Sequence, residues 1–286
     1  MPEDESQSLL TKPRAGSSAR AGAYSVARPA GTTLLLAWVA GYVDVVCYVM
    51  LFHIFVTHMT GNTAATALHV AQMDWKDALA RGSAIPMFAL GVIAGAALLE
   101  VRVRRGARSA YAPGFIVETL LLAAFIVAVG RRAGQPIHPD TGGFFLLLAL
   151  PTLAMGVQNA TFRKVGAATV RTTYITGMLT NFCEELVDYC FWAAGGCGAA
   201  CRRDKTVFLG TRRPSMRRIA LLGGIWVTFL VGSACGILSK AHFGPACLWL
   251  PVGCLVVLAA ADSVLPLGGG METAERRRLH RLRSGE

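Results

Sequence analysis

The sequence predicts an all-α, polytopic membrane protein with about six spanning helices and two further interrupted or re-entrant segments. Its 286 residues are 53% hydrophobic, which is too apolar for an ordinary soluble domain. Six apolar windows approach the roughly 20 helical residues that cross a hydrocarbon core of about 30 Å. The windows are residues 31–51, 82–99, 114–130, 141–162, 219–239 and 243–261. Asp44 and Glu118 are the charged residues inside them.

The two ends of the chain are predicted to lie outside the membrane. Residues 1–30 are rich in Ser, Ala and Arg without apolar periodicity, which is typical of a disordered tail. Acidic residues at positions 3–5 stand where a cleaved signal peptide needs positive charge, so none is expected. Glu5 to Leu10 resembles an acidic dileucine sorting signal, which leaves the plasma membrane and endosomal or vacuolar membranes both open. Residues 269–286 form a basic C-terminal tail.

Three sequence signs occur twice in the same order. Each copy has a glycine followed three positions later by a polar residue, then T-x-x-T-G, then F-x-x-G-x-x-x-G. These signs lie at 41–44, 57–61 and 88–95 in the first copy, and at 156–159, 173–177 and 229–236 in the second. Such self-similarity favours an internal duplication. We expect one membrane domain at 31–268, with repeat one at about 31–130 and repeat two at about 141–267.

The basic residues predict the topology. The net charge of +11 comes from clusters at the ends of apolar windows, which fits the positive-inside rule better than nucleic-acid binding. If the six windows cross and the N-terminus is cytoplasmic, most of the 28 basic residues, including those of a loop at 195–218, are cytoplasmic. The C-terminus is then cytoplasmic too. Each repeat contains three crossings, an odd number, so the second repeat is predicted to be inverted relative to the first.

The segments 52–72 and 165–194 make poor lipid-facing helices. They carry several His, Glu and Asp residues, and a charge at the bilayer centre costs roughly 2.5 to 3.5 kcal/mol. Broken, re-entrant or protein-buried segments are therefore predicted. We expect a short helix of about ten residues after each T-x-x-T-G turn, with threonine capping it and its start near the middle of the membrane. Two such starts would offer N–H groups and positive dipole ends to an anion or a polar solute.

Single residues in these segments each have a functional and a structural interpretation. Asp44 is a candidate proton carrier or cation ligand, and the alternative is a structural hydrogen bond to a turn threonine. His58 is a candidate proton shuttle or a buried, satisfied histidine. Gln158 and Asn159 suit a polar solute or a helix contact. Glu118 lies one turn into its span, close enough to the interface to be ordinary. The candidate solute-binding set is Asp44, His58, Thr60, Gly61, Asn62, Gln158, Asn159, Thr176, Gly177, Asn181 and Glu184.

Other classes of site have weaker support in the sequence. The glycines of the two F-x-x-G-x-x-x-G motifs are predicted to serve helix packing. A nucleophile elbow, a P-loop, a metalloprotease helix and a zinc-finger spacing are all absent from the sequence. The sequence therefore predicts no enzyme, no cofactor and no metal site.

The motifs also support a family resemblance. Residues 41–44 (GYVD), 57–62 (THMTGN), 156–161 (GVQNAT) and 173–181 (TYITGMLTN) resemble those of the YoaK-like family, which is grouped under a domain of unknown function. The resemblance covers about residues 31–268. It implies a multi-pass helical membrane protein and supplies no substrate or catalytic residue.

Three functions remain open from the sequence. The first is a secondary transporter or permease for a small polar or anionic solute, proton-coupled through Asp44, with its site between the two T-x-x-T-G helix starts. The second is a non-transporting membrane scaffold or assembly protein, and the third and least supported is an intramembrane enzyme. The expected partners are the lipid bilayer and the solute, not nucleic acid, and a homo-oligomer is left open.

Overall fold

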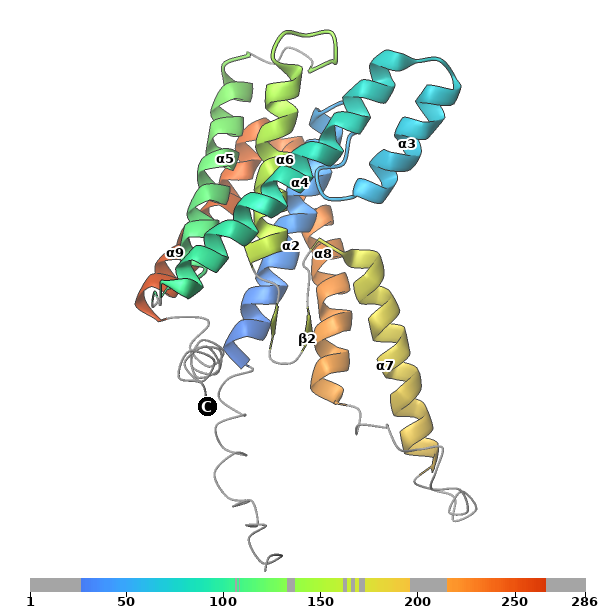
Figure 1. Cartoon of the computed structure of the whole chain (residues 1–286), viewed down its shortest axis with the longest axis vertical. Helices are drawn as coiled ribbons and strands as arrows, with labels where there is room; N and C mark the ends of the chain where they lie inside the picture. The colour runs from blue at the N-terminus through green and yellow to red at the C-terminus, as the bar shows by residue number, and fades with distance from the viewer. Residues whose placement is uncertain are drawn as a thin grey trace, which may run out of the picture.

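The described part of the chain is helical apart from one short strand pair (Figure 1). A computed structural model describes residues 27–105, 107, 109–132, 137–161, 164–165, 168–169, 173–195 and 215–265. The α-helices are α2 (Ala27–Met50), α3 (Met59–Ala71), α4 (Trp75–Arg104), α5 (Ala112–Gly130), α6 (Phe144–Thr161), α7 (Ile175–Gly195), α8 (Met216–Phe243) and α9 (Trp249–Val264), with a 3-10 helix η2 (Gly244–Leu248) before α9. Strands β1 (Lys164–Val165) and β2 (Ala168–Thr169) pair antiparallel. The prediction of a helical protein is thus confirmed. Residues 1–26 of the predicted disordered tail, the C-terminal tail, the sorting signal and most of the basic loop lie outside the described residues. Residues 27–30 belong to α2, so the prediction of a disordered tail up to residue 30 is wrong for these four positions.

Five stretches within the described residues are long and apolar enough to cross a membrane. Four of them are α2, α4, α5 and α6, and the fifth, Met216–Val264, combines α8, η2 and α9. The protein is therefore a multi-pass membrane protein. Gly244, at a φ of 56°, separates α8 from η2 in a backbone conformation that glycine adopts without strain. Six crossings remain a prediction, because α8 and α9 fall within one apolar stretch.

Glycines bring α2 and α8 into close contact. A Cβ on Gly41 would overlap the carbonyl oxygen of Phe229 in α8. Further along the same interface, a Cβ on Gly236 would lie 2.8 Å from the carbonyl oxygen of Tyr42. Only glycine lets the two backbones approach this closely, so the predicted packing role of the second F-x-x-G-x-x-x-G motif is confirmed.

The contact between α4 and α6 repeats that arrangement at matching motif positions. A Cβ on Gly156 would overlap the carbonyl oxygen of Phe88, just as a Cβ on Gly41 would overlap that of Phe229. A Cβ on Gly95 would lie 2.8 Å from the carbonyl oxygen of Val157. The first F-x-x-G-x-x-x-G motif therefore has the same packing role as the second, in the other helix pair.

Helices α3 and α7 both begin near the middle of the bundle and run towards opposite ends (Figure 1). α3 packs against α4, and α7 packs against α8. Neither is among the apolar stretches that could span a membrane. α3 has 13 residues, close to the expected length, whereas α7 has 21 instead of about ten. α7 continues past its acidic residues to Gly195.

The Thr-Gly pairs lie inside the first helical turn, which corrects the prediction of a turn before the helix. α3 begins at Met59 and α7 at Ile175, one residue ahead of Thr60 and Thr176. The N-cap of α3 is His58, which makes no side-chain capping bond. Thr60 is two residues past the N-cap position, so it is not the capping threonine that the sequence predicts.

Candidate functional site

A cavity of about 600 Å³ lies where α3 and α7 begin. Its lining includes residues 57–61 of the first T-x-x-T-G motif and residues 173–176 of the second, together with Phe55, Phe88 and Asn159. The two motifs are thus brought to one place, although more than one hundred positions separate them. Several lining residues are exposed, Thr60 and Thr176 among them, so the cavity is open on one side.

Asp44 lies behind this cavity with both carboxylate oxygens occupied. Its Oδ1 accepts hydrogen bonds from the backbone N–H groups of Val56, at 3.0 Å, and Thr57, at 2.8 Å. Its Oδ2 lies 2.7 Å from Nδ1 of His58. The side chain is 1% exposed. The contact to the turn threonine is therefore to its backbone N–H, not to its hydroxyl.

His58 brings an imidazole ring to the cavity lining. Its Nδ1 faces Asp44 and also lies 3.1 Å from the hydroxyl of Thr57. Its ring packs edge-on against Phe55 and Phe229, with centroids 5.0 and 5.6 Å away. The side chain is 35% exposed, and no described residue supplies a hydrogen-bond partner to Nε2. Asp44 therefore orients the ring through Nδ1, and Nε2 is available to a ligand.

The chain between α2 and α3 is irregular and needs side chains to satisfy its backbone. Phe52 and His53 have φ angles of 54° and 57°, in the left-handed region that non-glycine residues rarely adopt. Asn62 accepts a hydrogen bond from the N–H of Phe55 at 3.2 Å and donates to its carbonyl at 2.7 Å. Irregular backbone within a membrane protein needs such internal partners. Asn62, predicted to bind solute, instead stabilises this segment and does not line the cavity.

The neighbouring amides of α6 have different surroundings. Asn159 lines the cavity, is 6% exposed, and its Oδ1 has no hydrogen-bond partner among the described residues. Gln158 is fully buried and donates from Nε2 to the carbonyl oxygen of Leu36 in α2, at 2.8 Å. Of the two predicted amides, Asn159 therefore faces the candidate site, and Gln158 joins α6 to α2.

Of the four predicted solute-binding residues in α7, only Thr176 lines the cavity. Thr176 lines the cavity, whereas Gly177 packs against the ring of Tyr174, which a Cβ would overlap. Asn181 and Glu184 lie further along α7 and do not line the cavity. An α-helix advances about 5.4 Å per turn, so each turn of α7 moves away from its start.

The two helix starts contribute to the electrostatics of the cavity, together with the Asp44–His58 pair at its edge. The first N–H groups of a helix have no acceptor within the helix, and α3 has no side-chain cap. Each start carries a partial charge of about +0.5, so two starts together approach one positive charge. Among the residues that the structure describes, neither lysine nor arginine lines the cavity. This arrangement suits one small anion, or a neutral solute that accepts hydrogen bonds.

Sequence reasoning missed the aromatic part of the lining. Phe55, Phe88 and Tyr174 all contribute to the cavity. Phe88 opens the first F-x-x-G-x-x-x-G motif, and its counterpart Phe229 contacts the His58 ring. The duplication could have indicated both positions, because both phenylalanines precede packing glycines in the same way.

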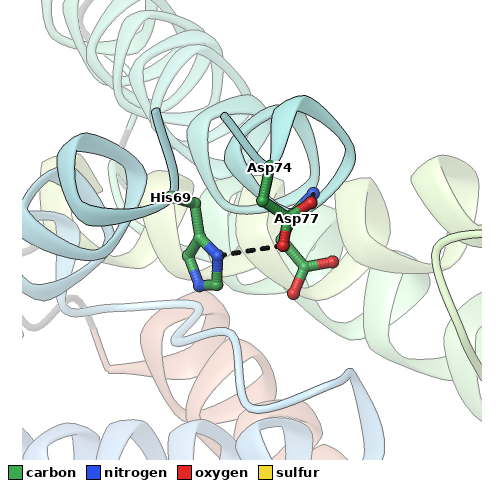
Figure 2. Close-up of side chains that lie close together, drawn as sticks. All are labelled: His69, Asp74 and Asp77. Atoms are coloured by element: carbon green, nitrogen blue, oxygen red, sulfur yellow. Dashed lines mark hydrogen bonds and ion pairs between the residues drawn. The ribbon is translucent and has the colours of Figure 1, made fainter. Parts of the chain in front are cut away.

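A second polar cluster lies in the α3–α4 connection, at the other end of α3. His69, Asp74 and Asp77 have potential ligand atoms within 4.8 Å of one another (Figure 2). Nδ1 of His69 lies 3.3 Å from Oδ2 of Asp74. Asp74 is also the N-cap of α4, where its Oδ1 accepts a hydrogen bond from the backbone N–H of Asp77. Helix capping and one ion pair account for these contacts.

Comparisons with known proteins agree with the fold. Residues 32–261 match the family described as "Protein of unknown function (DUF1275)". The chain is 26% identical over 223 residues to the UPF0700 transmembrane protein YoaK of Bacillus subtilis (strain 168). The aligned region covers 76% of this chain and 87% of that protein. No solved structure matches. The predicted resemblance to YoaK-like proteins is confirmed.

Proposed function

We propose that this chain, which belongs to the DUF1275 family, is a secondary transporter for a small polar or anionic solute. The solute binds in the cavity between the starts of α3 and α7. The main support is that both T-x-x-T-G motifs meet around one cavity with the amide oxygen of Asn159, which has no hydrogen-bond partner among the described residues. In this proposal the residues that line the cavity bind the solute and catalyse no reaction.

We propose further that the two halves form an inverted repeat. Matching glycines of the two halves make matching contacts, Gly41 with Phe229 and Gly156 with Phe88. The opposite directions of α3 and α7 support the same arrangement (Figure 1). In secondary transporters built from inverted repeats, the substrate site lies near the midplane beside the starts of half-helices. A solute site in the cavity between the starts of α3 and α7 is what this proposal expects.

In this proposal both termini are cytoplasmic. The first residues of α2 and the last residues of α9 lie towards the same end of the bundle, which agrees with an even number of crossings (Figure 1). The basic clusters of the sequence then face the cytoplasm, as the positive-inside rule expects.

The cavity limits the solute to a small molecule. A cavity of about 600 Å³ lies within the range of about 300 to 1,000 Å³ that is typical of small-molecule sites. Thr60 and Thr176 add hydroxyls to the N–H groups of the two helix starts, and Phe88 adds an apolar wall. A single carboxylate or another monoanion matches the partial charges best. A dianion would leave negative charge without a partner.

Proton coupling is assigned to the Asp44–His58 pair, with His58 carrying the proton. Asp44 already accepts two backbone hydrogen bonds, so it acts mainly by orienting the ring through Nδ1. Nε2 has no hydrogen-bond partner among the described residues, and His58 lines the cavity in which the solute binds. A protonated His58 adds positive charge beside an anionic solute, and this links proton uptake to solute binding.

Solute uptake into proteoliposomes tests the proposal. The probes are chloride, nitrate, formate, lactate and urea, with an inward pH gradient. Asn159→Leu removes the free amide oxygen while keeping a similar volume, so we expect at least a tenfold loss, about 1.4 kcal/mol, in the affinity for the transported probe.

Asn181→Leu is the matched control, because Asn181 lies on α7 outside the cavity lining. Its uptake should equal that of the unchanged protein. Equal uptake by the Asn159→Leu protein, or equal losses in both variants, would contradict a site at Asn159. A protein that neither binds nor transports any probe would favour the scaffold alternative.

A further inference from the structure

Glu118 lies on the buried face of α5. That face repeats every three or four residues and includes Phe115, Leu122 and Phe125, all of which are fully buried. Glu118 is also 0% exposed. The sequence placed it near the membrane interface as an ordinary residue. The structure instead places a carboxyl group within an apolar stripe that packs against the rest of the bundle.

Neither carboxyl oxygen of Glu118 has a hydrogen-bond partner among the described residues. Asp44, the other buried carboxyl group in an apolar window, accepts two backbone N–H groups and contacts His58. Asp262, buried in α9, accepts hydrogen bonds at the start of α5. Glu118 therefore differs from both, because nothing in the described part of the chain compensates a negative charge on it.

The described elements around α5 form no ion pair with Glu118. α5 packs mainly against α6 and α9, with fewer contacts to η2 and α4. α6 contains no titratable residue, and α5 contains none besides Glu118. The titratable residues of the other three elements are Cys254 and Asp262 in α9, Cys247 in η2, and Lys76, Asp77, Arg81, Glu100, Arg102 and Arg104 in α4. Among these, Arg102 donates to the carbonyl oxygen of Ser109, before α5, and Glu118 forms no ion pair within the described part of the chain.

We propose that Glu118 is a proton-binding site inside the membrane domain, separate from the cavity, and that it carries its proton in this conformation. An ionised carboxylate without a partner is strongly disfavoured in an apolar interior, whereas the neutral acid is tolerated. The proton can exchange with water only when the packing of α5 against α6 and α9 opens. Protonation of Glu118 is thus linked to a change in helix packing. This inference does not depend on solute binding in the cavity.

Labelling with dicyclohexylcarbodiimide tests the proposal on the full-length protein in lipid vesicles at neutral pH. This apolar reagent reacts with protonated carboxyl groups. The acid proton moves to a carbodiimide nitrogen, the carboxyl oxygen bonds to the central carbon, and an acyl shift from oxygen to nitrogen gives a stable N-acylurea. The product keeps all atoms of both reactants. Mass spectrometry should find this adduct on Glu118 and not on Asp44, which is also buried but has donors around it.

Two variants make the labelling specific. Glu118→Gln should lose the adduct. Glu100→Gln should keep it, because Glu100 is exposed and pairs with Arg104. An adduct on Asp44 with none on Glu118 would reverse the assignment and overturn the proposal.

Infrared spectroscopy covers the case in which the reagent fails to reach α5. The carbonyl stretch of a protonated carboxylic acid should be present in the unchanged protein at neutral pH and lost in Glu118→Gln. Glu118→Gln should also leave the midpoint of thermal unfolding nearly unchanged, because a neutral amide replaces a neutral acid. Identical carbonyl bands in the two proteins, or a large stabilisation by Gln, would show that Glu118 is ionised and the proposal wrong.

Discussion

Gly41→Ala is expected to lower the free energy of unfolding by about 1 to 3 kcal/mol, the usual cost of inserting a methyl group into a well-packed core. The added Cβ would overlap the carbonyl oxygen of Phe229, which is backbone and cannot rotate away. α2 and α8 must therefore separate. Gly156→Ala should cost a similar amount, because its Cβ would overlap the carbonyl oxygen of Phe88 in the other helix pair.

Gly31→Ala is the matched control for Gly41→Ala, since it lies in the same helix with nothing within 4 Å of an added Cβ. Alanine favours a helix by about 1 kcal/mol over glycine, so this change should be neutral or stabilising. Thermal unfolding in detergent measures all three proteins. A Gly41→Ala protein as stable as Gly31→Ala would contradict the close contact of α2 with α8.

Asp44→Asn is expected to keep the fold and lower proton-driven accumulation of solute by more than tenfold. The amide oxygen of asparagine can still accept from the N–H groups of Val56 and Thr57. The amide nitrogen, however, would replace the oxygen that faces Nδ1 of His58. The ring then loses its negative partner, and a protonated His58 is no longer stabilised.

Asp44→Leu should have a different effect, because it leaves two buried N–H groups unsatisfied at about 1 to 3 kcal/mol each. Loss of stability, and not only of accumulation, is expected. Glu100→Gln is the control carboxylate, because its exposed pair with Arg104 contributes about 0 to 1 kcal/mol. Accumulation in proteoliposomes and thermal unfolding together separate these outcomes. Full accumulation by Asp44→Asn would remove Asp44 and its charge from the mechanism.

Much of the helical architecture could be predicted from the sequence. Long apolar windows must form helices in a membrane, since backbone groups there need internal partners. The packing glycines were equally predictable, because small residues spaced four apart mark close helix contacts. The length of α7 was not, because the expected half-membrane helix had about ten residues, whereas α7 continues to Gly195.

The candidate site was predicted only in part. The duplicated motifs indicated Thr60 and Thr176, and both line the cavity. Asn62 and Asn159 look alike in sequence, yet one bonds to the backbone of Phe55 and the other keeps a free oxygen in the cavity. Residue type alone does not distinguish these roles, because they depend on where the irregular backbone needs partners. Glu118 was misjudged for a similar reason: its position in the helix was known, but the face that packs was not.

The account depends most on one solute binding between the two helix starts. Cysteines placed at Thr60 and Thr176, one at a time, test this in a protein whose eight native cysteines are replaced by serine. Their reaction with a membrane-permeant thiol reagent is measured with increasing amounts of the transported probe. We predict that the probe protects both cysteines over the same concentration range. Protection of only one cysteine, or of neither, would contradict a shared site.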